Sequence, residues 1–476
     1  MNFTGYDLIF LAIFLILISI FLYSNRKNLK RDGWLFLYRT KWGMKKIDRI
    51  GKKYKKTLKF LSYVSITCGY FLMGFMLYLF GKMVYLYIAY PAVVKAIKVP
   101  PITPLIPYLP QMFKLDFMPP FYFTYWILII ALIAITHEFA HGIFMRRYGV
   151  KIKSTGFGFF PFFLPIFLAA FVEQDEKSMK KSSNFNQMAI LSAGTFANIL
   201  TAILFFGIMC LFFISSFAPA GAQFNTYSYS AVAISSIISI NNYELNNPTY
   251  SQLLDLSKED GYNKIKNNNN QTYLITKEEL KGQKDESDYL VMYDDAPAIN
   301  AELKGAIISI NSVKINGWEE LGEQILRYSP GDKITITTIV NKEIQDYEII
   351  LEENENIPEE PYLGIGYAEQ KRTGVLGKLV QSLSSFKKQH IYYEPKFGAA
   401  EFIYDLLWWI AMISLSVALV NMLPMGIFDG GRFFYLTILS LTKSEKKAER
   451  WFKISTNFLL FLLVVLMVFW VISWII

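Results

Sequence analysis

The sequence predicts a polytopic α-helical membrane protein with about six transmembrane helices, an external α/β domain and a strand region embedded in the membrane. Of its 476 residues, 53% are hydrophobic and 17% are aromatic, and the mean hydropathy is +0.28. A soluble domain carries a smaller apolar share. Six apolar runs also reach the roughly 20 residues that a helix needs to cross a bilayer. The formal net charge of +9 is concentrated in one segment between the first two runs.

The six apolar runs define the predicted spans. They are Tyr6–Tyr23, Phe60–Tyr85, Pro119–Met145, Met188–Ile214, Phe402–Leu423 and Phe452–Ile476. The first run lacks a small-residue cleavage site and is followed by basic residues. It is therefore predicted to be an anchor and not a removed signal peptide.

The basic segment Arg26–Lys59 sets the predicted orientation. Loops rich in Lys and Arg stay in the cytoplasm, so this segment is expected inside. Both termini and the region between spans four and five then lie outside, and the second basic loop, Lys443–Arg450, falls inside as well. We expect an integral multi-pass protein of the cell membrane. The flanking spans account for the charge, so no nucleic-acid partner is expected.

Two segments are too interrupted to span the membrane as helices. Ala92–Met118 contains repeated prolines and is expected to be an external loop or a re-entrant stretch. Gly156–Val172 is very apolar but broken by Gly and Pro. It is predicted to form extended strands or a hairpin that enters the bilayer, where it must be buried in protein or line a wet cavity.

The region after span four is polar and has strand and turn signals typical of a small α/β domain. These are a strand over Gly305–Ile310, a helix over Trp318–Arg327 and a strand over Lys333–Val340, whereas Asn267–Asn270 is predicted to be a loop. The predicted organisation is 1–118 for two N-terminal spans and their loops, 119–222 for the first half of the membrane core, 223–370 for the external domain, 371–397 for an external connector and 398–476 for the second half of the core.

The third predicted span contains His137-Glu138-Phe139-Ala140-His141. On a helix, positions i and i+4 share a face, so both imidazoles can hold one zinc ion with the intervening Glu beside it as general base. Ionisable residues within a membrane span indicate a functional site. The motif therefore predicts a metallohydrolase with its active site in the membrane, with a chance motif on a buried helix as the alternative.

A hydrolytic zinc site needs a third protein ligand. His390 is the only other histidine, but it lies in the external connector and is expected to be a solvated surface residue. Asp429 is the better candidate because it follows the inward end of span five, on the side where the motif helix ends. A turn between helices is its alternative role. Asn198, inside span four, is equally consistent with a helix-bridging amide and with an oxyanion or substrate contact.

Three motifs together resemble the site-2 protease family of intramembrane zinc metalloproteases. They are H-E-x-x-H in one span, G-x-x-x-N from Gly194 in a later span, and N-x-x-P-x-x-x-x-D-G-G from Asn421 in another. The segment Phe171–Glu176 is similar to the family's chain after its membrane-embedded strands. Thr195 and Gly426 stand where family members often have Pro. The resemblance implies zinc ligation by His137, His141 and Asp429, general-base catalysis by Glu138, and substrate or oxyanion contacts by Asn198 and Asn421.

The external domain is similar to a PDZ domain, most clearly at Lys304–Asn311 and Ser329–Lys333. The resemblance to the site-2 protease family implies regulated intramembrane proteolysis, in which the chain cuts a membrane-anchored protein in or near its transmembrane segment. A catalytically inactive PDZ-like membrane adaptor and a zinc transporter are the alternatives. A transporter usually shows internal repeats, and this sequence shows none. The sequence does not define the oligomeric state.

Overall fold

The computed structural model describes residues 3–32, 35–91, 100, 105–115, 117–159, 168–283, 288–354, 357–369 and 373–475. The chain divides into two compact units. The first contains Met1–Phe212 and Glu401–Ile476, and the second contains Phe213–Ala400. Within the predicted external stretch Ala92–Met118, residues 92–99, 101–104 and 116 lie outside the described residues, and the described part contains the short helix α5 (Leu109–Met112).

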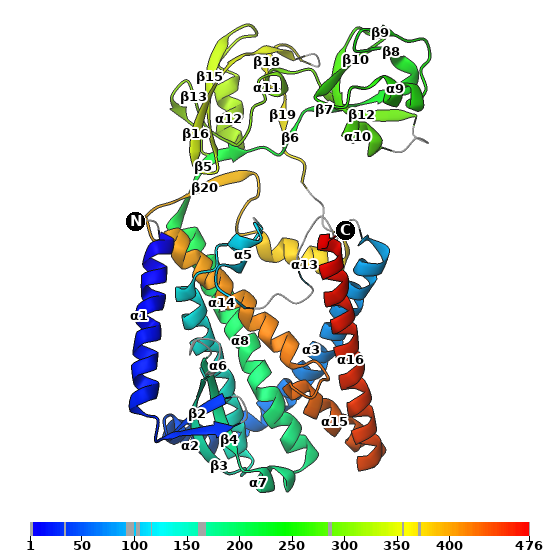
Figure 1. The fold of residues 1–476 in the computed structure, drawn as a ribbon. Helices are drawn as coiled ribbons and strands as arrows, with labels where there is room; N and C mark the ends of the chain where they lie inside the picture. Colours follow the sequence, from blue (N-terminus) through cyan, green and yellow to red (C-terminus); the bar gives the residue numbers. More distant parts are fainter. Residues whose placement is uncertain are drawn as a thin grey trace. The chain divides into compact units, whose positions relative to one another are not determined.

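Six long helices in the described part of the chain are apolar enough to cross a membrane, and each overlaps a predicted span (Figure 1). They are α1 (Phe3–Ser24), α3 (Lys55–Ala89), α6 (Phe123–Arg147), α8 (Asn184–Ser216), α14 (Ala400–Asn421) and α16 (Glu445–Ile475). Besides α5, the shorter helices of this unit are α2 (Met44–Lys53), α7 (Glu176–Lys180) and α15 (Asp429–Thr442). The predicted loop Lys443–Arg450 is mostly helical, because α16 already begins at Glu445.

A four-stranded antiparallel sheet lies at one end of the helices, near α2 and α7 (Figure 1). Its strands, in spatial order, are β1 (Leu29–Asp32), β2 (Leu35–Thr40), β3 (Ile152–Phe159) and β4 (Leu168–Gln174). The predicted strands within Gly156–Val172 thus belong to β3 and β4, and residues 160–167 lie outside the described part. The sequence missed β1 and β2, which arise from the basic segment. Gly156 is required where β3 meets β2, since a Cβ there would lie 2.2 Å from the Tyr38 carbonyl oxygen.

Helix α1 is attached to the start of α6 by a carboxylate. Asp7 is the buried residue among the described residues of α1. It accepts hydrogen bonds from the backbone N–H groups of Phe123, at 2.7 Å, and Thr124, at 2.9 Å, and from the Tyr108 hydroxyl. The first N–H groups of a helix have no partners within the helix, and its N-terminus favours negative charge. Asp7 therefore caps the helix that carries the two motif histidines.

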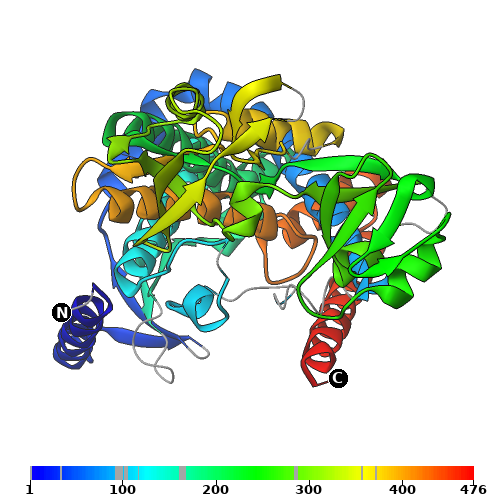
Figure 2. The ribbon, with the colours of Figure 1, turned by 90° about the horizontal axis from the view of Figure 1, so that it is seen from above.

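The second unit contains two six-stranded sheets, which lie side by side in Figures 1 and 2. One has the order β16-β15-β13-β5-β20, with β14 paired to β13. Its strands are β5 (Phe217–Gln223), β13 (Ala306–Ile310), β14 (Val313–Lys314), β15 (Lys333–Val340), β16 (Glu343–Ile350) and β20 (Ile391–Pro395). The other has the order β7-β12-β11-β10-β8-β9. Its strands are β7 (Tyr229–Ala233), β8 (Ile237–Ile240), β9 (Tyr243–Glu244), β10 (Tyr262–Asn267), β11 (Thr272–Thr276) and β12 (Tyr289–Asp294).

Short elements complete this unit. Two short strand pairs are present, β17 (Glu352–Asn354) with β18 (Ile357–Tyr362) and β6 (Thr226–Tyr227) with β19 (Ile365–Gly366). The helices are η2 (Ile234–Ser236), α9 (Tyr250–Leu256), α10 (Lys277–Lys281), α11 (Pro297–Asn300), α12 (Trp318–Ile325) and α13 (Gly374–Ser384). The sequence predicts one domain over 223–370, whereas β5 and β20 extend one sheet beyond both of those boundaries. The other sheet has its own buried core.

Candidate active site

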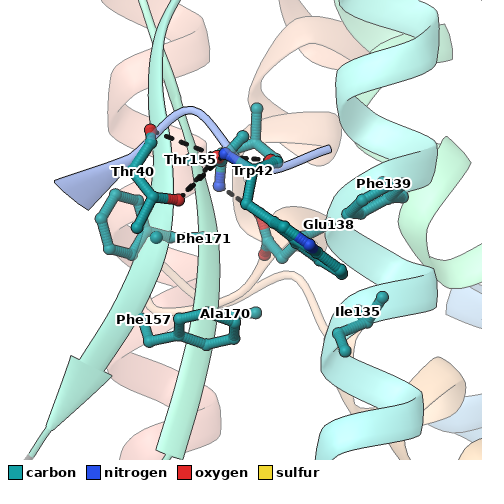
Figure 3. A pocket seen from close by; sticks show the side chains of 11 residues that line it. Thr40, Trp42, Ile135, Glu138, Phe139, Thr155, Phe157, Ala170 and Phe171 are labelled. Carbon is teal, nitrogen blue, oxygen red and sulfur yellow. Dashed lines mark hydrogen bonds between the residues drawn. The ribbon is translucent and has the colours of Figure 1, made fainter. Parts of the chain in front are cut away.

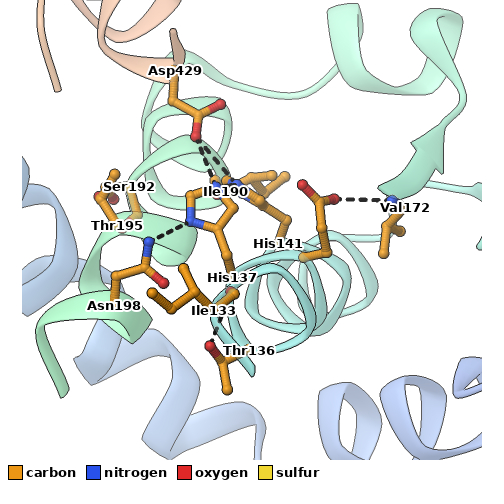
Figure 4. A network of polar contacts seen from close by, with 11 residues as sticks. Ile133, Thr136, His137, His141, Val172, Ile190, Ser192, Thr195, Asn198 and Asp429 are labelled. Carbon is orange, nitrogen blue, oxygen red and sulfur yellow. Dashed lines mark hydrogen bonds and ion pairs between the residues drawn. The ribbon is translucent and has the colours of Figure 1, made fainter. Parts of the chain in front are cut away.

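Helix α6 places both motif histidines on one buried face. His137 and His141 are 9% and 6% exposed, and their Nε2 atoms lie 3.0 Å apart (Figure 4). The i, i+4 spacing of the sequence produces this pairing. The neighbouring residue Glu138 leaves the helix in a different direction. Its carboxylate accepts a 2.9 Å hydrogen bond from the Val172 N–H of β4.

Asp429 approaches the histidines from a distant part of the chain. Its Oδ2 atom lies 3.3 Å from Nε2 of His137 and 3.3 Å from Nε2 of His141. Asp429 is the first residue of α15, and not a residue of a simple turn. A Cβ on Gly430 would lie 2.4 Å from the Met422 carbonyl carbon. The D-G-G motif thus lets α15 begin directly against the chain that leaves α14.

The three side-chain atoms have the spacing of a zinc site. Ligand atoms on a tetrahedral zinc with bonds of about 2.0–2.1 Å lie about 3.3 Å from one another. Two imidazole nitrogens and a carboxylate oxygen also suit the preferences of this metal. Glu138 could ligate too, since its carboxylate and both imidazoles offer atoms within 4.8 Å of one another. Asp429 fits better, because its oxygen contacts both Nε2 atoms while Glu138 is turned toward β4.

A backbone carbonyl orients the His141 ring. His141 Nδ1 lies 2.7 Å from the carbonyl oxygen of Ile190 in α8. A carbonyl can only accept, so Nδ1 carries the hydrogen and Nε2 keeps its lone pair on the side of Asp429. Such a partner fixes both tautomer and ring orientation in metal-binding histidines. The neutral tautomer that a metal needs is therefore built into this packing.

Asn198 has the corresponding position beside His137. It is fully buried, and its Nδ2 lies 3.0 Å from His137 Nδ1, while its Oδ1 has no hydrogen-bond partner among the described residues. Rotating the carboxamide by 180° turns Oδ1 toward His137 Nδ1–H, from which it accepts a hydrogen bond. His137 Nε2 is then free to bind a metal. The predicted substrate or oxyanion contact stays a prediction, whereas the structure shows a contact with the histidine ring.

Gly194 is a site residue to which the sequence analysis assigned no role. A Cβ at this position would lie 2.4 Å from His141 Nε2 and 2.7 Å from His137 Nε2. Only glycine therefore allows α8 to pass directly against both imidazoles. The signal was present in the sequence, because Gly194 is the first residue of the G-x-x-x-N motif.

The structure also describes Asn421 and His390, the two other predicted positions. Asn421 is the last residue of α14, and among the described residues no hydrogen bond joins its amide to His137, His141 or Asp429. His390 belongs to the second unit. Its ring lies 5.5 Å from that of Tyr367, and its carbonyl accepts a hydrogen bond from Gln223. It is half-buried there, and not fully solvated as expected.

A multi-pass helical unit with a His–Glu–His cluster inside one helix defines the class of membrane metalloproteases. The profile of peptidase family M50, the site-2 protease family, matches residues 125–466, and the chain belongs to this family. An uncharacterized protein from Methanocaldococcus jannaschii, MJ0971, is 36% identical over 191 residues, which cover 39% of this chain and 46% of the relative. The zinc metalloprotease RasP from Shouchella clausii is 22% identical over 215 residues, 40% of this chain and 50% of RasP. The matches thus span about half the length of these curated relatives.

Proposed function

We propose that this chain is a zinc metalloendopeptidase that hydrolyses a peptide bond in or near the transmembrane segment of a membrane-anchored protein. The observation that carries the proposal is the convergence of three side chains at ligand spacing. His137 and His141, with Glu138 beside them, come from a helix long enough to cross a membrane, and Asp429 comes from α15. Membership in family M50 and the similarity to the zinc metalloprotease RasP support it.

Each residue of the site has a separate role in the proposed hydrolysis. A zinc ion held by His137, His141 and Asp429 would polarise the scissile carbonyl and acidify a water. Glu138 accepts the proton of that water and delivers it to the leaving amine. Its carboxylate is held toward β4 by the Val172 N–H, so the base has a fixed position before substrate arrives. Asn198 and the Ile190 carbonyl keep both imidazoles in the required orientation.

The sheet beside α6 supplies a way to hold the substrate. A transmembrane helix hides its carbonyl groups in its own hydrogen bonds, so cleavage requires a locally extended segment. Within the described part of the chain, β4 pairs only with β3, so apart from the Val172 N–H, which is bonded to Glu138, its other edge has no partner strand and could receive one. Because β4 also contacts Glu138, a peptide added at this edge lies next to the general base.

The proposed location is the cell membrane, with both termini and the β-rich second unit outside and the active site toward the cytoplasm. The positive-inside rule supports this orientation. Helix α6 ends at Arg147, and Arg146 forms an ion pair with Asp48 of the basic helix α2 at 2.5 Å. The C-terminal end of α6 and the basic helix α2 therefore lie at the same end of the helices. A PDZ-like role in binding external peptide segments is proposed for the second unit.

Cleavage of a membrane-anchored substrate tests the proposal. The full chain is reconstituted in liposomes with a panel of single-span model proteins, and products are identified by mass spectrometry. We expect cuts in or beside the model span, loss of cleavage with a zinc chelator, and recovery when zinc is added back. Cleavage that persists without zinc, or no cleavage under any condition, would exclude the proposed activity.

A further inference from the structure

A small hollow lies between α6 and the sheet, directly beside the proposed general base (Figure 3). The space inside it that the centre of a water molecule can reach is about 20 Å³. Its walls come from four separate parts of the chain, which are residues 40–42, α6, β3 and β4, and they include Trp42, Glu138, Phe139, Thr155, Ala170 and Phe171. One ordered water needs roughly 10–15 Å³ measured in this way. The hollow therefore has room for the end of one small side chain and not for a complete ligand.

The chemistry of the walls selects an apolar occupant. Glu138 is the one ionisable residue of the lining, and its carboxylate is bonded to the Val172 N–H. The Thr155 hydroxyl donates to the Trp42 carbonyl at 2.7 Å, and the Thr40 hydroxyl accepts from the Trp42 N–H at 3.1 Å. Both hydroxyls are thus occupied within the wall. Apart from the Glu138 carboxylate, which the proposed reaction uses, these side chains offer a polar occupant no free partner to replace its lost water.

Trp42 forms one wall of the hollow, and the turn that carries it is packed against α6. The next residue, Gly43, has φ +77°, and a Cβ on it would lie 2.3 Å from Phe139. This glycine lets the turn lie directly on α6. The indole ring then meets Phe139 edge-on at 5.5 Å and lies 6.4 Å from the Phe157 ring. Trp42 precedes the residues that match the family profile, so this wall is a feature of the present chain's N-terminal segment.

We propose that this hollow is a specificity subsite, which receives one aliphatic side chain of the substrate next to the bond that is cut. The inference rests on the proposed peptidase function. Side chains of an extended peptide alternate between the two faces of a sheet. A strand added beside β4 therefore directs every second side chain toward α6, where the hollow opens next to Glu138. Trp42 and Ala170 then determine how large that side chain can be.

Two substitutions change the size of the subsite in opposite directions. Trp42→Ala removes one wall, and Ala170→Leu fills the space from β4. The matched control is Tyr54→Ala, which removes an exposed aromatic residue of the same N-terminal segment that does not line the hollow. The full chain in liposomes is given single-span model proteins that differ only in one residue beside the mapped cleavage site, which is Gly, Val, Leu or Phe.

We expect the unmodified chain to cut the Val and Leu substrates fastest. Ala170→Leu should lower cleavage of the Leu substrate relative to the Gly substrate by about tenfold or more, the usual effect of a changed apolar pocket. Trp42→Ala should raise cleavage of the Phe substrate relative to Leu by a similar factor, and Tyr54→Ala should change neither ratio. Zinc content and cleavage of the Gly substrate show that each variant is folded.

Unchanged ratios in both Trp42→Ala and Ala170→Leu, with chelator-sensitive cleavage intact, would overturn the subsite and leave the peptidase function standing. Absence of chelator-sensitive cleavage by the unmodified chain would instead overturn the peptidase function, and the subsite with it. If Ala170→Leu does not fold, the Phe-to-Leu ratio of Trp42→Ala decides the matter alone.

Discussion

A Cβ on Gly194 would lie 2.4 Å from Nε2 of His141, so the backbone of α8 passes directly against that imidazole. Contacts that close are not tolerated in proteins, and a side chain at this position would displace the ring. His141 is held on its other nitrogen by the Ile190 carbonyl of the same helix. Helix α8 thus determines both the position and the tautomer of a proposed zinc ligand that belongs to α6.

Gly194→Ala should therefore lower zinc affinity and proteolysis together, because the added methyl group moves both imidazoles. Loss of support around metal ligands typically costs about 10- to 100-fold in affinity. Gly207→Ala in the same helix is the matched control, since its Cβ meets no atom within 4 Å. Zinc titration of the purified variants measures the difference. Equal zinc affinity in both variants would show that α8 does not constrain the site.

Asn198→Ala separates two roles of this amide. If Asn198 holds the His137 ring, its loss lowers zinc affinity about 10- to 100-fold even without substrate. If it contacts only the substrate, zinc affinity stays unchanged while cleavage falls. The structure favours the first result, because Asn198 lies 3.0 Å from His137 Nδ1. Metal titration of the substrate-free protein distinguishes them.

Asp7→Asn should destabilise the helical unit without touching the site. The charged carboxylate accepts two backbone hydrogen bonds at the start of α6, and hydrogen bonds to charged groups contribute about 1.5–3 kcal/mol each. Thermal unfolding in detergent should therefore begin at a lower temperature. Ile16→Ala, at a position of α1 that is 59% exposed, is the control. An unchanged transition for Asp7→Asn would mean that this cap contributes little.

Burial and the Asp7 carboxylate also raise the pKa of Tyr108 above its usual value. Its phenol therefore remains protonated and continues to donate to Asp7 across the neutral range. Tyr108→Phe removes one hydrogen bond to Asp7 and leaves the two from the backbone of α6. It should therefore lower the unfolding temperature less than Asp7→Asn does in the same measurement.

Orientation in the membrane can be tested by cysteine labelling. Cys68 and Cys210 are first replaced, since they are the two cysteines of the chain. A cysteine introduced at Lys46 should be protected from an impermeant reagent in intact cells, and one at Asn268 should react. The opposite pattern would invert the orientation and place the active site toward the outer face.

The spans could be predicted from sequence because their signal is local. Each of the six apolar runs became a helix, with ends that differ from the prediction by a few residues; α1, for example, begins at Phe3 and not at Tyr6. In the second unit, the strand Lys333–Val340 has the predicted bounds, and Asn267–Asn270 leads from β10 into the turn before β11. In these places, hydropathy and turn residues determine the structure without distant partners.

The remaining features depend on contacts between distant residues. Strands β1 and β2 lie in a basic segment that is typical of a loop, and β2 pairs with β3 across a long separation in sequence. The membrane topology predicts that Asp429 and the histidines lie at the same end of the helices. It does not predict the contact between Asn198 and His137, because that depends on the rotation of α8 against α6.

The role of the cluster is tested most directly by measuring zinc content and cleavage together in Glu138→Gln and Asp429→Ala. Glu138→Gln should keep full zinc occupancy and lose cleavage, because the ligands remain while the proton acceptor is gone. Asp429→Ala should lose both, because the carboxylate 3.3 Å from each Nε2 atom is removed. Appreciable turnover by Glu138→Gln, or full zinc occupancy in Asp429→Ala, would contradict the proposed assignment of base and ligands.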